Sequence, residues 1–238
     1  MAWHHKIRQN LSGELLRRTI SALLLAPIVL AIVVQGGVLY QCLIVAASLL
    51  MLHEWHAMVL NQNEEWQEQK RKRWNVAGFL YALIFAVALL YLRDLPKGLS
   101  ILIFAISITW ATDIAAYAAG RIIGGPKILP AVSPSKTWSG LAGGMLAAAL
   151  VGAISAPFLA ETMQLINWFY GAMLGMILAV IAQAGDFLES WVKRQCRVKD
   201  SGALIPGHGG ILDRLDGLWA VAIIVACMVA ANGGEIIQ

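Results

Sequence analysis

Two groups of carboxylates flank a long polar segment in the C-terminal part of the chain. Asp186, Glu189 and Lys193 recur at helical spacing, so they share one face if this region is a helix. Asp213 and Asp216 are three residues apart at the start of the next apolar run. Carboxylates from two helix ends can hold a hard cation, and Mg²⁺ typically keeps positions for water and substrate phosphate. The spacing therefore predicts a divalent-metal site.

The segment between these carboxylates is rich in basic residues and glycine. It carries Lys193, Arg194, Arg197 and Lys199, followed by Pro-Gly-His-Gly-Gly at 206–210. Glycines allow backbone N–H groups to form an anion-binding concavity, and the cations suit a polyphosphate. Each residue alone is compatible with a solvated loop. Together, at the end of an apolar run, they favour phosphoryl or nucleotidyl transfer.

A second polar stretch lies inside an apolar run. Asp113 stands where a carboxylate costs about 2.5–3.5 kcal/mol on membrane-insertion scales. Thr109, Asp113, Tyr117 and Gly120 fall on one helical face, which should point into a bundle. Two interpretations remain open: a buried Asp satisfied by a neighbouring helix, or a residue lining a polar cavity beside the metal site.

A third stretch, Ser-Pro-Ser-Lys-Thr at 133–137, precedes another apolar run. Hydroxyls and a lysine at a helix N-terminus can bind phosphate with the help of backbone N–H groups and the helix dipole. The same residues can equally cap the helix, and the two roles are compatible.

The composition places these residues in a membrane protein. Of the 238 residues, 59% are hydrophobic and only 13% are charged, whereas soluble domains have about 25% charged residues. Because a span needs about 20 residues, we expect an all-α, polytopic transmembrane helical bundle of about seven spans. The expected spans are 19–35, 38–60, 76–92, 98–120, 138–160, 165–185 and 218–231.

The basic residues predict the orientation. With the N-terminus in the cytoplasm, every Lys and Arg except Arg93 and Lys97 falls on the cytoplasmic side, as the positive-inside rule expects. The net charge of +4 then reflects cytoplasmic loops, and no nucleic-acid partner is expected. We expect the polar segment 61–75 to be a solvated loop touching anionic headgroups.

The motifs resemble one known family, the phosphatidate cytidylyltransferases (CDP-diacylglycerol synthases). The similarity rests on three stretches, from about residue 110 to the C-terminus, with Ser135 where a lysine is common. They are Asp113-x₃-Tyr117-x₂-Gly120-Arg121, Ser133-Pro134-x-Lys136-Thr137-Trp138, and Ser190-x-Val192-Lys193-Arg194-x₄-Lys199-Asp200-x-Gly202-x₂-Ile205-Pro206-x-His208-Gly209-Gly210-x₂-Asp213-Arg214-x-Asp216.

The resemblance implies a reaction and its participants. CTP and phosphatidic acid would give CDP-diacylglycerol and pyrophosphate, with Mg²⁺ and a monovalent cation such as K⁺. The protein would be a homodimer in the bacterial cytoplasmic membrane, with its site facing the cytoplasm. Residues 1–97 would form N-terminal membrane helices, and residues 98–238 the catalytic region.

The resemblance also assigns roles to residues of this sequence. Metal ligands would be Asp186, Asp213 and Asp216. Further catalytic residues would be Lys193, Arg194, Lys199, Asp200 and His208. Substrate-binding residues would be Asp113, Tyr117, Ser133, Lys136, Thr137, Ser190, Gly209, Gly210 and Arg214.

Three other functions remain as alternatives. A cytidylyltransferase acting on another lipid phosphate would have the same motifs. A CDP-alcohol phosphotransferase also uses clustered Asp residues, but its usual Asp-Gly-x₂-Ala-Arg opening is absent from this sequence. A transporter with Asp113 as an ion site would leave the stretch from Lys199 to Asp216 unexplained.

Overall fold

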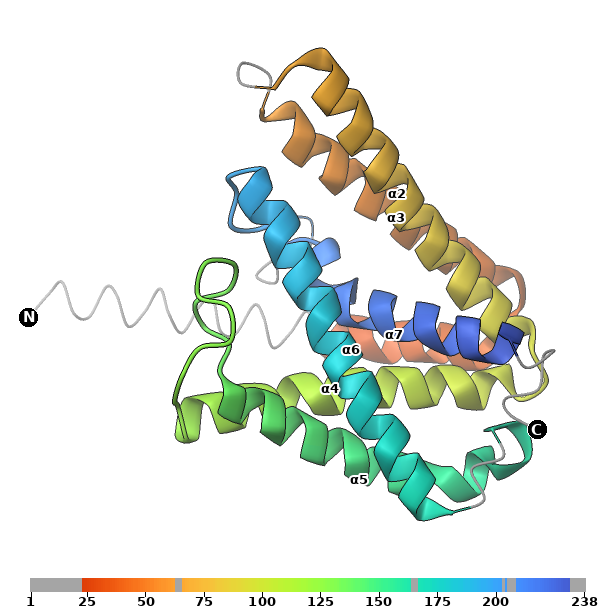
Figure 1. Ribbon diagram of the computed structural model, residues 1–238. Coiled ribbons are helices and arrows are strands. Elements are labelled where there is room, and N and C mark those ends of the chain that lie inside the picture. Colours follow the sequence, from red (N-terminus) through yellow and green to blue (C-terminus); the bar gives the residue numbers. More distant parts are fainter. Residues whose placement is uncertain (1–22, 63–65, 164–166, 203, 205–208, 232–238) are drawn as a thin grey trace, which may run out of the picture.

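The chain forms a bundle of long helices in a computed structural model (Figure 1). The structure describes all residues except 1–22, 63–65, 164–166, 203, 205–208 and 232–238. Within the described part, six helices are long and apolar enough to cross a membrane, and no strand occurs apart from one isolated β-bridge. The predicted all-α, polytopic fold is confirmed. The six helices are α2 (Gly37–Leu60), α3 (Glu68–Asp94), α4 (Gly98–Ile122), α5 (Trp138–Met163), α6 (Trp168–Gln195) and α7 (Leu212–Ala231).

Helix α7 lies at the centre of the bundle. It contacts α3, α4 and α6, while α4, α5 and α6 pack on one another and α2 packs on α3 (Figure 1). Fully buried apolar side chains from several of these helices, among them Met51, Phe85, Leu92 and Ile108, fill the interior. Many other apolar side chains remain exposed on the outer surfaces of the helices, as expected of helices that face lipid.

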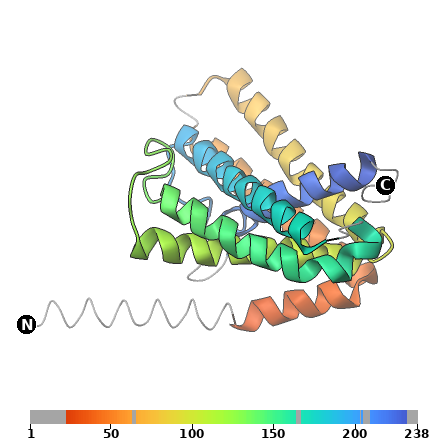
Figure 2. The same ribbon diagram turned by 60° about the horizontal axis from the view of Figure 1, so that its bottom comes forward.

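The first predicted span is described only from Leu23. The helix Leu23–Gln35 is followed by Gly36 and Gly37, both with positive φ, which turn the chain into α2. Arg93 at the end of α3 donates hydrogen bonds to the carbonyl oxygens of Val33 and Val34, both at 3.3 Å. These bonds hold the end of this helix against the bundle, and Figure 2 shows the helix on the side of α4.

Two helices extend beyond their predicted spans and carry site residues. The sixth span was expected to end at residue 185, but α6 continues to Gln195, so Asp186, Glu189 and Lys193 do share a helix. Helix α7 begins at Leu212, six residues before the predicted span, and therefore includes Asp213 in its first turn. A carboxylate in the first turn is favoured by the helix dipole.

The expectation of a loop over 61–75 was wrong for its second half, because α3 begins at Glu68. Charged residues such as Lys and Arg are good helix formers, and Glu68 pairs with Lys72 one turn later at 2.7 Å. The ring of Trp74 lies 5.2 Å from that of Trp66 and 5.8 Å from that of Trp191. Aromatic packing therefore secures the polar start of α3.

Helices α5 and α6 approach closely at a glycine contact. A Cβ atom on Gly152 would overlap the carbonyl oxygen of Gly171, and a Cβ on Gly175 would overlap that of Ala148. Small residues of this kind let membrane helices pack backbone to backbone.

We expect Gly152→Val to destabilise the bundle by about 1–3 kcal/mol, because the added methyl groups would force α5 and α6 apart. The thermal midpoint in detergent should fall. Leu150→Val is the control, since Leu150 is 66% exposed on the same helix. Equal midpoints for the two variants would contradict the close contact.

Candidate functional site

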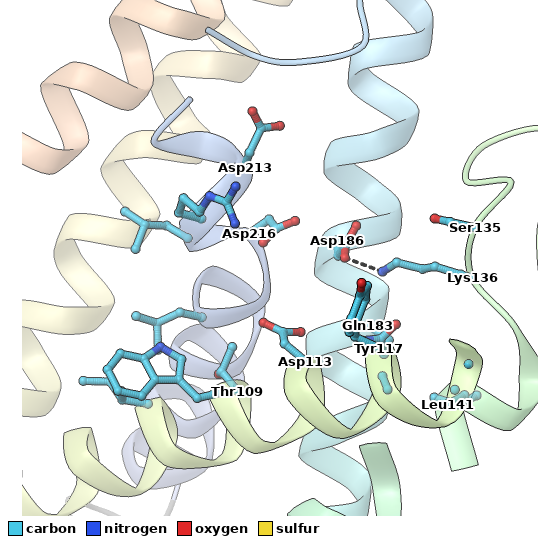
Figure 3. A pocket seen from close by; sticks show the side chains of 18 of the residues that line it. Thr109, Asp113, Tyr117, Ser135, Lys136, Leu141, Gln183, Asp186, Asp213 and Asp216 are labelled. Carbon is cyan, nitrogen blue, oxygen red and sulfur yellow. Dashed lines mark ion pairs between the residues drawn. The ribbon is translucent and has the colours of Figure 1, made fainter. Parts of the chain in front are cut away.

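A cavity of about 690 Å³ opens between the helix Leu23–Gln35, α4, α6 and the first turns of α7. In Figure 3, Asp216 on α7 and Lys136 from the segment before α5 point toward Asp186 on α6, whereas Asp213 points away from them. The wall from Leu23–Gln35 and the middle of α4 is largely apolar. The polar residues that line the cavity include Asp113, Tyr117, Ser135, Lys136, Thr137, Gln183, Asp186, Asp213, Arg214 and Asp216.

Three carboxylates meet beside this cavity. One carboxylate oxygen from each of Asp186, Glu189 and Asp216 lies within 4.8 Å of the others. Gly185 makes this possible, because a Cβ there would overlap the backbone oxygen of Asp216 and crowd Ala220. Helices α6 and α7 can therefore cross with their acidic side chains adjacent.

Two lysines lie against the carboxylates. Lys136 Nζ is 2.5 Å from Asp186 Oδ2, as drawn in Figure 3. Lys193 Nζ lies 2.6 Å from Glu189 Oε2 and 2.5 Å from Asp213 Oδ1. Lys193, Glu189 and Asp213 expose 13% or less of their side chains, whereas Asp186 exposes 32%. The attraction between opposite charges is therefore strongest around Lys193. The lysines offset part of the repulsion between the carboxylates.

The segment before α5 delivers Lys136 to the cavity. Residues Lys127 and Thr137 form an antiparallel bridge, and Ile128 N donates to the Lys136 carbonyl at 3.1 Å. The Thr137 hydroxyl accepts a hydrogen bond from Gly140 N at 3.1 Å, so it caps α5. The capping interpretation is thus confirmed for Thr137, which also lines the cavity. Ser133 is buried and does not line the cavity.

Asp213 is held by the α6–α7 connection. Its Oδ2 atom accepts hydrogen bonds from Ser201 N and Gly210 N at 3.1 Å, and from Ser201 Oγ at 3.0 Å. The three-carboxylate group contains Glu189, which was not among the predicted metal ligands. Asp213 reaches that group through Lys193. A metal role for Asp213 remains a prediction.

The other predicted residues take varied positions. Asp113 points into the cavity (Figure 3). Tyr117 accepts a hydrogen bond from Arg121 at 2.7 Å, and Ser190 donates to Asp186 at 3.3 Å. Arg214 is on the cavity wall.

Several residues of the predicted motif do not line the cavity. Arg194 donates to the carbonyl oxygens of Val132 and Val198, so it joins two loops. Lys199 and Asp200 are exposed and absent from the lining. Gly209 has a positive φ of 84°, and His208 lies outside the described residues.

The sequence analysis assigned no site role to Glu54 or Ser201. Glu54 is only 2% exposed and accepts hydrogen bonds from Ser201, Ile211 and Leu212. The available signal was an ionisable residue inside the apolar run 38–60, since such residues are rare in membrane spans. Ser201 gave no comparable signal, because serine is common in loops.

The carboxylate group fits a hard divalent cation. Its donors are oxygen atoms only, which is the ligand chemistry that Mg²⁺ prefers. Glu189 Oε1 is buried and has no hydrogen-bond partner in the part of the chain that the structure describes. Buried polar atoms are normally satisfied, so an unpartnered oxygen beside two further carboxylates is consistent with cation binding.

Comparison with known proteins agrees with this chemistry. The profile of the Cytidylyltransferase family matches residues 60–231. A phosphatidate cytidylyltransferase of Brucella suis biovar 1 (strain 1330) is 45% identical over 160 residues, which cover 67% of this chain and 58% of the relative. One of Rickettsia bellii (strain RML369-C) is 31% identical over 224 residues, covering 93% of each chain. This chain spans less than two thirds of the length of the Brucella relative. The family profile, however, matches most of this chain. This chain therefore belongs to the cytidylyltransferase family.

Proposed function

We propose that this protein transfers CMP from CTP to phosphatidic acid, giving CDP-diacylglycerol and pyrophosphate. The observation that carries the proposal is the pairing of three carboxylates and two lysines with a cavity whose opposite wall is apolar. The polar side suits a triphosphate, and the apolar side suits the chains of a lipid. The names of the Brucella and Rickettsia relatives support the same reaction.

The reaction needs no side-chain nucleophile. The phosphate monoester of phosphatidic acid has a second pKa of about 6, so it is largely a dianion at neutral pH. One of its oxygens attacks the α-phosphorus of CTP, and the bond to the bridging oxygen of the β-phosphate breaks. That oxygen leaves with pyrophosphate. The obstacle is the approach of two anions, so catalysis depends on positioning and electrostatic stabilisation.

The chain's own cations would meet the phosphates. Lys136, at the N-terminal end of α5, would contact a substrate phosphate with help from Thr137 and the helix dipole. Lys193 would neutralise charge while it keeps Glu189 and Asp213 in place. Both lysines already lie within ion-pair distance of the carboxylates, so their positions are fixed before substrate binds.

Asp186, Glu189 and Asp216 would hold the divalent cation, for which we propose Mg²⁺. Asp213 remains a candidate ligand, and K⁺ a candidate second ion. When bound, such a cation neutralises charge on the triphosphate and on the departing pyrophosphate.

The apolar wall would receive the lipid. Val29, Leu30, Ile106 and Trp110 all line the cavity, and these apolar side chains would accept the chains of phosphatidic acid or of another lipid phosphate. We propose the orientation with the N-terminus and the site on the cytoplasmic side of a bacterial cytoplasmic membrane, because the basic residues favour it. A homodimer is also proposed.

We expect detergent-purified protein to convert labelled CTP and phosphatidic acid into labelled lipid and pyrophosphate when Mg²⁺ is present. Asp216→Asn should reduce turnover at least about 100-fold, because it removes a charged ligand from the carboxylate group. Glu68→Gln, on the exposed start of α3, is the control. If an isoprenoid lipid phosphate gives product and phosphatidic acid does not, the lipid substrate is the isoprenoid compound. If neither lipid gives product, the proposal is contradicted.

Glu189→Gln should raise the Mg²⁺ concentration needed for half-maximal turnover about tenfold or more, because an amide oxygen is a weaker ligand than a carboxylate. A Mg²⁺ titration of activity measures this, with unchanged Mg²⁺ dependence in Glu68→Gln as the comparison. If Glu189→Gln titrates like the wild type, Glu189 is not a ligand.

Lys136→Met should raise the KM for CTP or for the lipid about 10- to 100-fold, because a charged hydrogen bond to phosphate is lost. Steady-state kinetics with each substrate varied in turn identifies which phosphate Lys136 contacts. Lys72→Met removes a lysine that is 74% exposed and should leave both KM values unchanged. Unchanged KM values in Lys136→Met would exclude the contact.

A further inference from the structure

Glu54 is a buried carboxylate on α2, outside the segment that matches the family profile. It is 2% exposed and is among the largest fully buried side chains of the described residues. Burying a charge is costly unless hydrogen bonds satisfy it. The partners of Glu54 therefore indicate what its burial achieves.

Those partners lie in the connection between α6 and α7 and at the first residue of α7. Glu54 Oε1 accepts from Ile211 N at 2.9 Å, and Oε2 accepts from Leu212 N and from Ser201 Oγ, both at 3.0 Å. The first N–H groups of a helix lack partners within the helix. Glu54 thus caps α7 from a different helix, where its negative charge also suits the helix dipole.

Asp213 accepts hydrogen bonds from further donors of the connection between α6 and α7. Its Oδ2 atom accepts from Ser201 N, Ser201 Oγ and Gly210 N. The Ser201 hydroxyl lies 3.0 Å from both Glu54 Oε2 and Asp213 Oδ2. Because it has one proton, the two carboxylate oxygens share it as acceptors, and Ser201 contacts both carboxylates.

The chain closes tightly around Glu54. A Cβ on Gly202 would lie 2.7 Å from Glu54 Oε1, and one on Gly210 would lie 2.7 Å from Oε2. Only glycine fits at these two positions without displacing the carboxylate. The contact is therefore specific in shape as well as in charge.

We propose that Glu54 is a positioning residue of the proposed transferase site, acting through Ser201 and the start of α7 to fix the orientation of Asp213. Asp213 Oδ1 in turn binds Lys193, which binds Glu189. Only the kinetic test of this inference rests on the proposed function. Independently of that function, α2 fixes the geometry of residues on α6 and α7.

Two variants test this chain of contacts. Glu54→Gln keeps the shape of the side chain but presents an NH₂ group to donors that need an acceptor, and Ser201→Ala removes the shared hydroxyl. Tyr40→Phe is the matched control, because Tyr40 donates a buried hydrogen bond from the same helix to the Leu89 carbonyl at 2.9 Å and lies outside the cavity lining.

We expect Glu54→Gln to lower kcat about 10- to 100-fold, since hydrogen bonds to charged groups are involved, while the KM for CTP changes less than about threefold. Tyr40→Phe should lower the thermal midpoint about as much as Glu54→Gln does, but it should leave kcat unchanged. The double variant Glu54→Gln with Ser201→Ala should lose less than the product of the single losses, because both changes break one network.

Hydrogen exchange of the Ile211 and Leu212 amides gives a readout that needs no activity. Exchange should accelerate in Glu54→Gln and stay unchanged in Tyr40→Phe. If exchange accelerates but the wild type converts no lipid, the proposed function fails and the positioning role stands. The inference would be overturned if the amides of Glu54→Gln exchange as in the wild type, or if Tyr40→Phe lowers kcat as much as Glu54→Gln does. It would also be overturned if the loss of kcat in the double variant equals the product of the two single losses.

Discussion

Like charges repel, and the site depends on holding three carboxylates together where little water reaches them. At 4 Å and an effective dielectric constant of about 20, two unit charges interact by roughly 4 kcal/mol. Lys136 and Lys193 offset this repulsion, one through Asp186 and the other through Glu189. The arrangement is stable as a set, because removing one member leaves a buried charge without its partner.

Helix crossing brings these charges together. Gly185 lets α6 approach the backbone of α7 at Asp216, and Gly152 does the same for α5 and α6. Residues without side chains are thus as necessary to the site as the charged residues. In a bilayer, such close contacts also replace the hydrophobic driving force that water would provide between helices.

Much of this arrangement could be predicted from the sequence, and the remainder has physical causes. Hydropathy located six of the long helices, and the spacing of Asp186, Glu189 and Lys193 predicted their shared face. The polar start of α3 was missed because its aromatic packing against α6 is a long-range contact. Spacing alone did not show that Lys193 pairs with both Glu189 and Asp213, since this depends on how α7 enters the bundle.

Glu54 shows that the segment matched by the family profile and the unit that folds are different. The family profile begins at residue 60, six residues after the side chain that satisfies the N–H groups of Ile211 and Leu212. The apolar wall formed by Val29 and Leu30 lies further upstream still. A fragment cut at residue 60 would retain the three carboxylates but lose the cap of α7 and one side of the cavity.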